Sequence, residues 1–252
     1  MHRFHLPPDQ CHGDELVLTD DEAHHALRVL RLRKGDSAIV LDGAGGEYHG
    51  QVTATSSRTV RLQVTRRTST PPPPCAVTLV QAVPKGKIFE SIIHRATELG
   101  AWRIVPLLSS RVVVQLDTSQ RAHKLAHWRA TAVEAIKQCG SSWLPCIDPP
   151  VTVAGFLARA ETFDLSLVGS LQPGSRHPKA WFESWRTQHV PRSTPIAVSV
   201  WIGPEGDFTP EEIASIENAG ARPISLGPLV LRVETAATYC LSILNYELLQ
   251  QK

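Results

Sequence analysis

Two loops near the C-terminus combine residue types that suit a binding site. They are Trp201–Ile213 (WIGPEGDFTPEEI) and Leu226–Ala236 (LGPLVLRVETA). In each, an apolar, strand-like run ends at a Gly-Pro step and polar residues then begin a helix. Glycine lets a ligand approach the backbone and proline stiffens the loop, so its amides and carbonyls can contact an adenine edge and a ribose. One such loop alone would equally well be a tight turn between strand and helix.

The pairing of the two loops favours a site. Loops that follow neighbouring strands of a parallel sheet meet at the carboxyl edge of that sheet, where open α/β sheets bind their ligands. No G-x-G-x-x-G follows a predicted strand, which argues against a nicotinamide dehydrogenase. The ligand must therefore be held in another way.

Charged residues at the start of the last predicted helix are candidates for catalysis. Arg232 lies between the apolar residues Leu231 and Val233, where a guanidinium needs a partner such as a phosphate, a carboxylate or a substrate carbonyl. Glu234 could act as a base, or it could only complement the N-terminus of the helix. Glu205, in the first loop, is the alternative base.

A basic strip runs along the predicted N-terminal helix. It consists of His24, Arg28, Arg31, Arg33 and Lys34. Arg3 extends this strip, and Lys85 and Lys87 continue it beyond the first predicted strand of the C-terminal half. A solvated charged face is the simpler explanation, but a basic strip on a small β-rich domain favours RNA binding, in which phosphate contacts provide affinity and not sequence choice.

Composition limits the other possibilities. The 252 residues can form one large or two small domains, and the net charge of +2 means that nucleic-acid affinity must come from local patches. The five cysteines are scattered, and no apolar run has the length of a membrane span, so we expect a cytoplasmic protein in a reducing compartment. We assign no metal, because the histidines lack metal-ligand spacing. Cys139 is expected to be a buried structural thiol.

A run of four prolines, 71–74, divides the chain. Four prolines make a stiff extended spacer, so we expect a small domain over residues 1–68, a linker over 69–74 and a larger domain over 75–252. The small domain should be a β-barrel or sheet with one helix. That helix begins at a capping box, Thr19–Glu22, and ends at Gly35. The strands are expected at 38–41, 49–53 and 59–64, with a turn at 42–46.

The larger domain alternates strands and helices, which indicates a parallel α/β sheet. Strands are predicted at 77–83, 104–108, 163–168, 196–202 and 223–226. Helices are predicted at 88–99, 118–139 and 234–249, with another that starts at a capping box and proline, Thr209–Glu212.

These blocks together resemble the SPOUT superfamily of methyltransferases, and more narrowly the bacterial small-subunit (16S) rRNA uracil-N3 methyltransferases. The matching blocks span nearly the whole chain: His25–Arg31 with Lys34–Asp36, Arg95–Gly100, Glu134 with Gln138–Gly140, Ile202–Gly206, Leu226–Pro228, and Val230–Arg232 with Glu234–Ala236. Two positions depart from the family pattern. Asp207 stands where the family usually has a second glycine, and Ser141 stands where it commonly has an arginine.

The resemblance implies a PUA-like N-terminal β-barrel, a C-terminal α/β domain tied in a deep trefoil knot, a homodimer, and S-adenosylmethionine held in the knotted loops. Carried onto this chain, the cofactor-binding residues are Gly169, Ser170, Leu171, Ile202, Gly203, Pro204, Glu205, Gly206, Leu226, Gly227, Pro228 and Leu231. The implied substrate is 16S rRNA.

As a mechanism, Arg232 would stabilise charge on the uracil carbonyl oxygens while Glu234 accepts the N3 proton. Two alternatives stay open. The protein could methylate another base or a ribose 2′-hydroxyl, or it could be a non-catalytic RNA-binding module with a vestigial cofactor pocket.

Overall fold

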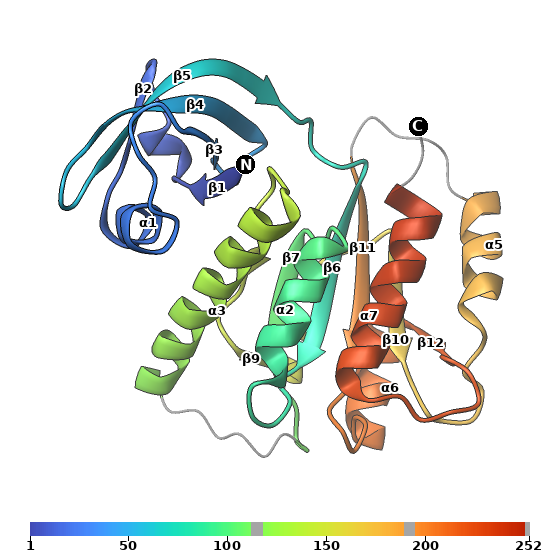
Figure 1. Ribbon diagram of the computed structural model, residues 1–252. Helices are drawn as coiled ribbons and strands as arrows, with labels where there is room; N and C mark the ends of the chain where they lie inside the picture. Colours follow the sequence, from blue (N-terminus) through green and yellow to red (C-terminus); the bar gives the residue numbers. More distant parts are fainter. Residues whose placement is uncertain (112–117, 189–194, 250–252) are drawn as a thin grey trace. The chain divides into compact units, whose positions relative to one another are not determined.

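The computed structural model describes residues 1–111, 118–188 and 195–249. It divides the chain into two compact units, between Pro72 and Pro73 in the run of prolines (Figure 1). The first unit contains Met1–Pro72 together with Val133–Leu144, and the second contains Pro73–Ala132 and Pro145–Lys252.

The first unit is built on a 5-stranded sheet in the order β1-β3-β4-β5-β2. The strands are β1 His2–His5, β2 Glu15–Leu18, β3 Ser37–Leu41, β4 Gly46–Thr55 and β5 Val60–Ser69. β1 runs parallel to β3, and the other pairs are antiparallel. The core includes Phe4, Leu16 and Leu62 from the strands. The sequence predicted β3, β4 and β5 and the turn before β4, but not β1 or β2.

The helix of this unit differs from its prediction at both ends. Helix α1 (Asp20–His24) continues into a π-helical turn, His25–Val29, and does not extend to Gly35. The predicted capping box is wrong, because the Thr19 hydroxyl donates to the Asp20 carboxylate, at 3.0 Å, and caps no backbone amide. Ala23 and Ala26, on one side of this helical segment, are buried in the core.

The end of a long helix, α3 (Thr118–Cys139), packs within the first unit. Arg3 donates to the carbonyls of Lys137 and Gln138, at 3.3 and 3.2 Å, and so satisfies acceptors that the helix end leaves free. The buried Lys137 ammonium binds Glu22 at 2.8 Å. Burial alone would lower the pKa of Lys137, but its hydrogen bonds to Glu134 and Glu22 outweigh this and leave that pKa raised.

Gly140 follows α3 with a φ of +80°, in the left-handed region that favours glycine. A Cβ atom at this position would also lie 2.9 Å from the Arg3 guanidinium. Cys139, the residue before Gly140, is exposed, so the expectation of a buried structural thiol is wrong. The Ser141 hydroxyl donates to the carbonyl of Trp143, at 2.9 Å.

The second unit contains a 7-stranded parallel sheet in the order β12-β10-β11-β6-β7-β8, with β9 also paired to β7. Its strands are β6 Cys75–Ala82, β7 Arg103–Leu108, β8 Cys146–Ile147, β9 Val151–Thr152, β10 Leu165–Gly169, β11 Ile196–Ile202 and β12 Arg222–Ile224. The predicted parallel α/β architecture is confirmed. The sequence predicted five of these strands; the two-residue strands β8 and β9 were not predicted.

Helices cover both faces of this sheet. They are α2 Ile88–Glu98, the part of α3 up to Ala132, α4 Val153–Leu157, α5 Pro178–Gln188, α6 Pro210–Asn218 and α7 Val233–Leu244, the last continued by a π-helical turn, Asn245–Leu249. Helices α2 and α7 lie side by side on one face (Figure 1). Residues of α4 and α6 share a core with Val80, Val105 and Val168 from the strands. The predicted capping box of α6 is confirmed at Thr209 and Glu212.

A charged cluster joins the strands at the β8 end of the sheet. The nearly buried carboxylate of Asp148 accepts from Arg103 at 2.9 and 2.6 Å and from Arg159 at 2.6 Å. Arg103 also pairs with Glu161 at 2.6 Å. Burial raises the pKa of Asp148, but the hydrogen bonds and charges of the two arginines outweigh this and lower it below its ordinary value.

Replacing Asp148 with asparagine should destabilise the fold by about 2–3 kcal/mol at pH 7. This is less than for a fully buried pair, because the Arg103 and Arg159 side chains remain 23% and 31% exposed. A carboxylate whose pKa is lowered in the folded state contributes stability above its unfolded pKa, near 3.9, and loses that contribution as the pH falls through its folded pKa. Urea unfolding from pH 7 down to pH 2 measures the difference.

The control is Glu161→Gln, which removes the more exposed carboxylate of the same cluster and should cost less. An Asp148→Asn effect that stayed constant down to pH 2 would contradict the ionic origin of the stabilisation.

Candidate functional site

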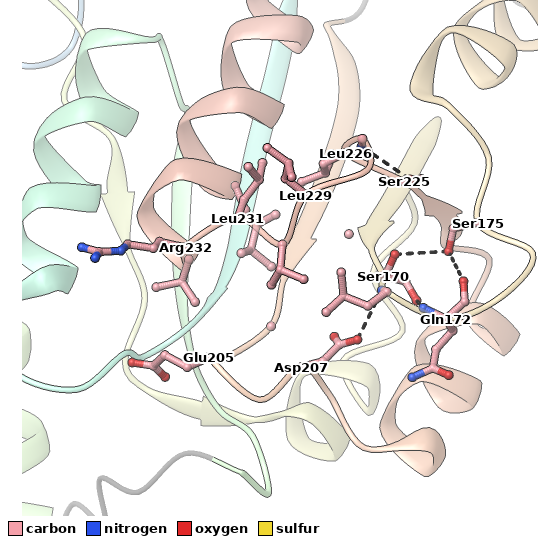
Figure 2. A pocket seen from close by; sticks show the side chains of 18 of the residues that line it. Ser170, Gln172, Ser175, Glu205, Asp207, Ser225, Leu226, Leu229, Leu231 and Arg232 are labelled. Atoms are coloured by element: carbon pink, nitrogen blue, oxygen red, sulfur yellow. Dashed lines mark hydrogen bonds between the residues drawn. The ribbon is translucent and has the colours of Figure 1, made fainter.

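A pocket of about 770 Å³ lies in the second unit, where three loops meet at the carboxyl ends of parallel strands. The loops follow β10, β11 and β12, and the start of α7 closes the site. Figure 2 shows side chains from these loops around the cavity. This is the edge at which the two Gly-Pro loops were expected to converge.

The structure brings together nearly all residues predicted for cofactor binding. Those that line the pocket are Gly169, Ser170, Leu171, Ile202, Gly203, Pro204, Glu205, Leu226, Gly227, Pro228 and Leu231. Gly206 is not among the lining residues; its carbonyl instead accepts a hydrogen bond from Arg111. Arg232 and Glu234 also line the pocket, so the catalytic candidates lie in the same cavity.

Sequence reasoning missed one side of the pocket, formed by Gln172–Ser175 and by Ser225. The Ser175 hydroxyl donates to the carbonyls of Ser170 and Gln172, at 3.3 and 2.9 Å, which folds the segment back on itself (Figure 2). The signal in the sequence was the Gln-Pro-Gly-Ser turn directly after the strand.

Asp207 links two of the pocket loops. Its φ of +60° lies in the left-handed region. Glycine adopts this region without strain, and asparagine and aspartate adopt it more readily than other residues do. Its carboxylate accepts from the amide of Phe208, at 2.8 Å. It also accepts from the amide of Leu171, at 3.3 Å (Figure 2). The departure from glycine therefore adds a tie between the loop after β11 and the loop after β10.

Arg232 and Glu234 stand at the beginning of α7. Arg232 is the N-cap residue, but its side chain makes no capping hydrogen bond. The expected apolar setting of Arg232 is wrong, because Arg232 is exposed and Val230 is 75% exposed. Neither side chain is hydrogen-bonded or ion-paired to another residue in the described part of the chain. Both are therefore available to a ligand.

Glu205 has a structural partner. Its Oε1 atom accepts from the amide of Lys85, at 3.3 Å, which ties the loop after β11 to the loop after β6. In Figure 2, Glu205 and Arg232 lie on the same side of the pocket, away from Ser175. Because Glu205 accepts the Lys85 amide, Glu234 is favoured over Glu205 as the free carboxylate of the pocket.

The charges of the pocket lining are unbalanced. The lining includes three carboxylates, Glu205, Asp207 and Glu234, and one guanidinium, Arg232. The Leu226–Leu231 loop adds apolar surface, including Leu229, which is 74% exposed. The pocket therefore suits a ligand that combines positive charge with an apolar or aromatic part.

Comparison with protein families decides the class of this chain. Residues 71–245 match an RNA methyltransferase domain, and residues 18–65 match an RNA methyltransferase PUA domain. The chain belongs to this RNA methyltransferase family. The first match covers the sheet, the pocket loops and α7. The second gives the N-terminal unit its PUA-like assignment, as the sequence predicted.

Two relatives of the RNA methyltransferase carry the same name. The chain is 35% identical over 249 residues to the ribosomal RNA small subunit methyltransferase E of Synechocystis, covering 97% of this chain and 77% of that protein. It is 29% identical over 231 residues to the protein of the same name from Bacillus subtilis, covering 91% and 89%. The predicted resemblance to bacterial small-subunit rRNA methyltransferases is thus confirmed.

Solved structures agree with this assignment. A methyltransferase from Legionella pneumophila, with the cofactor SAM bound, superposes with a TM-score of 0.84 at 30% identity and covers 97% of this chain and 96% of that one. The fold is also that of a ribosomal RNA small subunit methyltransferase E from Neisseria gonorrhoeae, at a TM-score of 0.83 and 24% identity, covering 98% and 97%.

Most of the predicted RNA-binding residues of this methyltransferase are exposed. In the first unit they are His24, Arg28, Arg31, Arg33 and Lys34, and in the second they are Lys85 and Lys87. Arg3 is different, because it is only partly exposed and is used to cap α3. The strip is interrupted at Arg31, whose φ of +57° ends the helical path.

Among the described residues, no group of three or more His, Cys, Asp or Glu side chains could hold a metal ion. A search of the same residues finds no helix with the length and apolar character of a membrane span.

Proposed function

We propose that this protein transfers a methyl group from S-adenosylmethionine to N3 of a uridine in 16S rRNA, in the cytoplasm. The observation that carries the proposal is the pocket at the carboxyl edge of the sheet, where the loops singled out by sequence meet Arg232 and Glu234. The family assignment supports methyl transfer to RNA. Uracil N3 rests on the narrower resemblance of the motifs.

The lining residues fit this cofactor. S-adenosylmethionine supplies a methyl group on a positively charged sulfonium, and its α-amine is also positive. Glu205, Asp207 and Glu234 complement such charges, while the three loops offer backbone amides and carbonyls to an adenine and a ribose. A volume of about 770 Å³ lies within the range of ligand pockets that enclose most of a small molecule.

Arg232 and Glu234 are the proposed catalytic residues. Uracil N3 carries a proton and lies on the pairing edge, so the base must leave its stack before it can react. Glu234 accepts the N3 proton as the new N–CH₃ bond forms, and the sulfur keeps the electron pair of the bond that breaks. Arg232 donates hydrogen bonds to a uracil carbonyl oxygen, where negative charge develops.

The N-terminal unit is the proposed RNA-binding domain, through the exposed basic residues of α1 and the segment after it. A homodimer is proposed as well. Exposed apolar side chains support it: Leu229 and Val230 on the loop before α7, and Tyr239 and Tyr246 along α7 and the turn that follows. Sedimentation equilibrium tests the dimer, and a monomer at micromolar concentration would contradict it. The deep trefoil knot stays a prediction.

Asp207→Asn should weaken cofactor binding about 3–10-fold, the effect of one modest hydrogen bond. Asparagine tolerates the positive φ and keeps an acceptor for the Phe208 amide, but its amide nitrogen cannot accept from Leu171. The loop after β10 then loses its side-chain link to the loop after β11. Calorimetry with S-adenosylmethionine measures the change.

Asp207→Gly is the companion variant, because it relaxes the backbone and removes both hydrogen bonds. It should bind no more tightly than Asp207→Asn. Wild-type affinity in both variants would show that the link between the loops does not matter for the cofactor.

The direct test of the function uses purified protein, methyl-labelled S-adenosylmethionine, and small ribosomal subunits that lack the modification. The RNA is then digested to nucleosides and analysed by mass spectrometry. We expect the label in N3-methyluridine. Label in another base or in a ribose 2′-hydroxyl would select the first alternative. Calorimetry that detects no cofactor binding would select the second, a non-catalytic RNA-binding module.

A further inference from the structure

Two arginines beside the pocket are held by an aromatic ring instead of a carboxylate. The guanidinium carbons of Arg176 and Arg222 each lie 5.4 Å from the ring centroid of Trp181. Within the ranges that the structure describes, no ion pair or side-chain hydrogen bond engages either guanidinium. Both side chains are exposed. Arg186, on the same helix as Trp181, shows the ordinary arrangement, since it pairs with Glu247.

The backbone holds this cluster in place. Arg176 forms a bridge with Ile224, in which its amide donates to the Pro223 carbonyl at 3.2 Å and its carbonyl accepts from Ser225 at 2.9 Å. The Trp181 indole also donates to the Pro223 carbonyl, at 3.2 Å. Arg222 belongs to β12, the edge strand of the sheet, and Trp181 to α5, which lies at the same end of the sheet (Figure 1).

The chemistry of the cluster suits a phosphate group. A guanidinium that rests on an aromatic ring keeps its N–H edges free, and those edges match the oxygens of a phosphate. Both guanidinium groups rest on the same ring, and neither is paired with a carboxylate among the described residues. Their positive charges are therefore available to an anion.

The cluster also adjoins the methyltransferase pocket. Ser175 and Ser225 both line the pocket (Figure 2), and they are the sequence neighbour and the hydrogen-bond partner of Arg176. A phosphate bound here would belong to a chain that passes the rim of the pocket on the side of α5.

We propose that Arg176 and Arg222, supported by Trp181, bind backbone phosphates of the RNA substrate next to the target nucleotide. The inference rests on the proposed function and adds a second RNA contact surface, distinct from the basic residues of the N-terminal unit. It assigns affinity and positioning to these residues, and not choice of sequence.

The test compares RNA binding by the wild type and by the double variant Arg176→Ala/Arg222→Ala, using full-length protein and a 16S rRNA transcript. Filter binding is measured over a series of KCl concentrations. Each phosphate contact to unpaired RNA that is lost should reduce the slope of log K against log[KCl] by about 0.7. We expect a reduction of about 1.4 for the double variant, with unchanged affinity for S-adenosylmethionine.

The matched control is Lys179→Ala/Arg186→Ala. Like the test variant, it removes two positive charges, here both from α5. These charges are paired with carboxylates, Lys179 with Glu183 at 3.8 Å and Arg186 with Glu247. The control should change the slope little. Arg176→Lys/Arg222→Lys should keep most of the slope, because the charges remain, and it guards against misfolding in the alanine variant.

Three results would overturn the proposal: an unchanged slope in the alanine variant, an equal reduction in the control, or a loss of cofactor affinity without a change in slope. The last would assign the arginines to the cofactor. Failure of the proposed function looks different, because the wild type itself would then transfer no methyl group to the small subunit.

Discussion

Arg232→Ala is expected to lower kcat by about 10²–10³-fold, the usual effect of removing one donor that stabilises charge in the transition state. The fold should survive, because the Arg232 side chain caps no backbone group and its backbone, with φ −64° and ψ 153°, suits alanine. The exposed guanidinium makes no hydrogen bond or ion pair with a described residue, so its loss leaves no buried group unpaired. Cofactor affinity, measured by calorimetry, should be nearly unchanged.

Arg232→Lys serves as the comparison, because it keeps a charge but not the planar fork of donors. It should recover only part of the lost turnover. If Arg232→Ala instead abolished cofactor binding, Arg232 would belong to the cofactor site and the assignment of charge stabilisation at uracil would be contradicted.

Glu234→Gln should reduce turnover by about 10²–10⁴-fold at neutral pH, because glutamine has the same shape but cannot accept the N3 proton. Raising the pH should partly restore its activity, since hydroxide then removes the proton that the missing carboxylate would take. A purely structural role at the start of α7 would affect stability by only about 0.3–1 kcal/mol and would give no such pH rescue. Initial rates between pH 7 and 10, together with thermal unfolding, distinguish the two roles.

Glu205→Gln is the matched comparison, because Glu205 lies in the same pocket and is tied to the Lys85 amide. Its loss of turnover should be much smaller and should not respond to pH. The reverse pattern, with the large pH-dependent loss in Glu205→Gln, would make Glu205 the base.

Features that depend only on residues close together in the chain could be predicted from the sequence. The box formed by Thr209 and Glu212 depends only on residues three apart, and the structure contains it. The central parallel strands β6, β7, β10 and β11 could be predicted because each is a largely buried apolar run. Thr19 has the same local pattern as Thr209, but Asp20 adopts a φ of +47° and takes the threonine hydroxyl. Local chemistry alone does not distinguish these two outcomes.

Features that depend on contacts between residues far apart in the chain could not be predicted from the sequence. Val133–Leu144 packs with the N-terminal unit through Arg3 and Glu22, more than 100 residues earlier in the chain. Strands β8 and β9 contain two residues each, too few for a periodic pattern. The side of the pocket that the sequence did not predict, Gln172–Ser175 with Ser225, depends on the bridge between Arg176 and Ile224. This bridge brings the loop after β10 beside β12.

The candidate site was predicted from two sources. The loops at 203–206 and 226–231 followed from the residues themselves, because Gly-Pro steps after apolar strands point to one edge of a sheet. The loop at 169–171 came from the family resemblance, since Gly-Ser-Leu after a strand is not distinctive. Asp207 was noticed as a departure from the family, but its bond to Leu171 required the folded chain.

The central claim is that this protein methylates uracil N3 in 16S rRNA. It is tested most directly by deleting the gene in its host, digesting the 16S rRNA to nucleosides and restoring the gene as wild type or as Arg232→Ala. We predict that N3-methyluridine disappears on deletion, returns with the wild type and stays absent or strongly reduced with the variant. N3-methyluridine at its normal level in the deletion strain would contradict the claim.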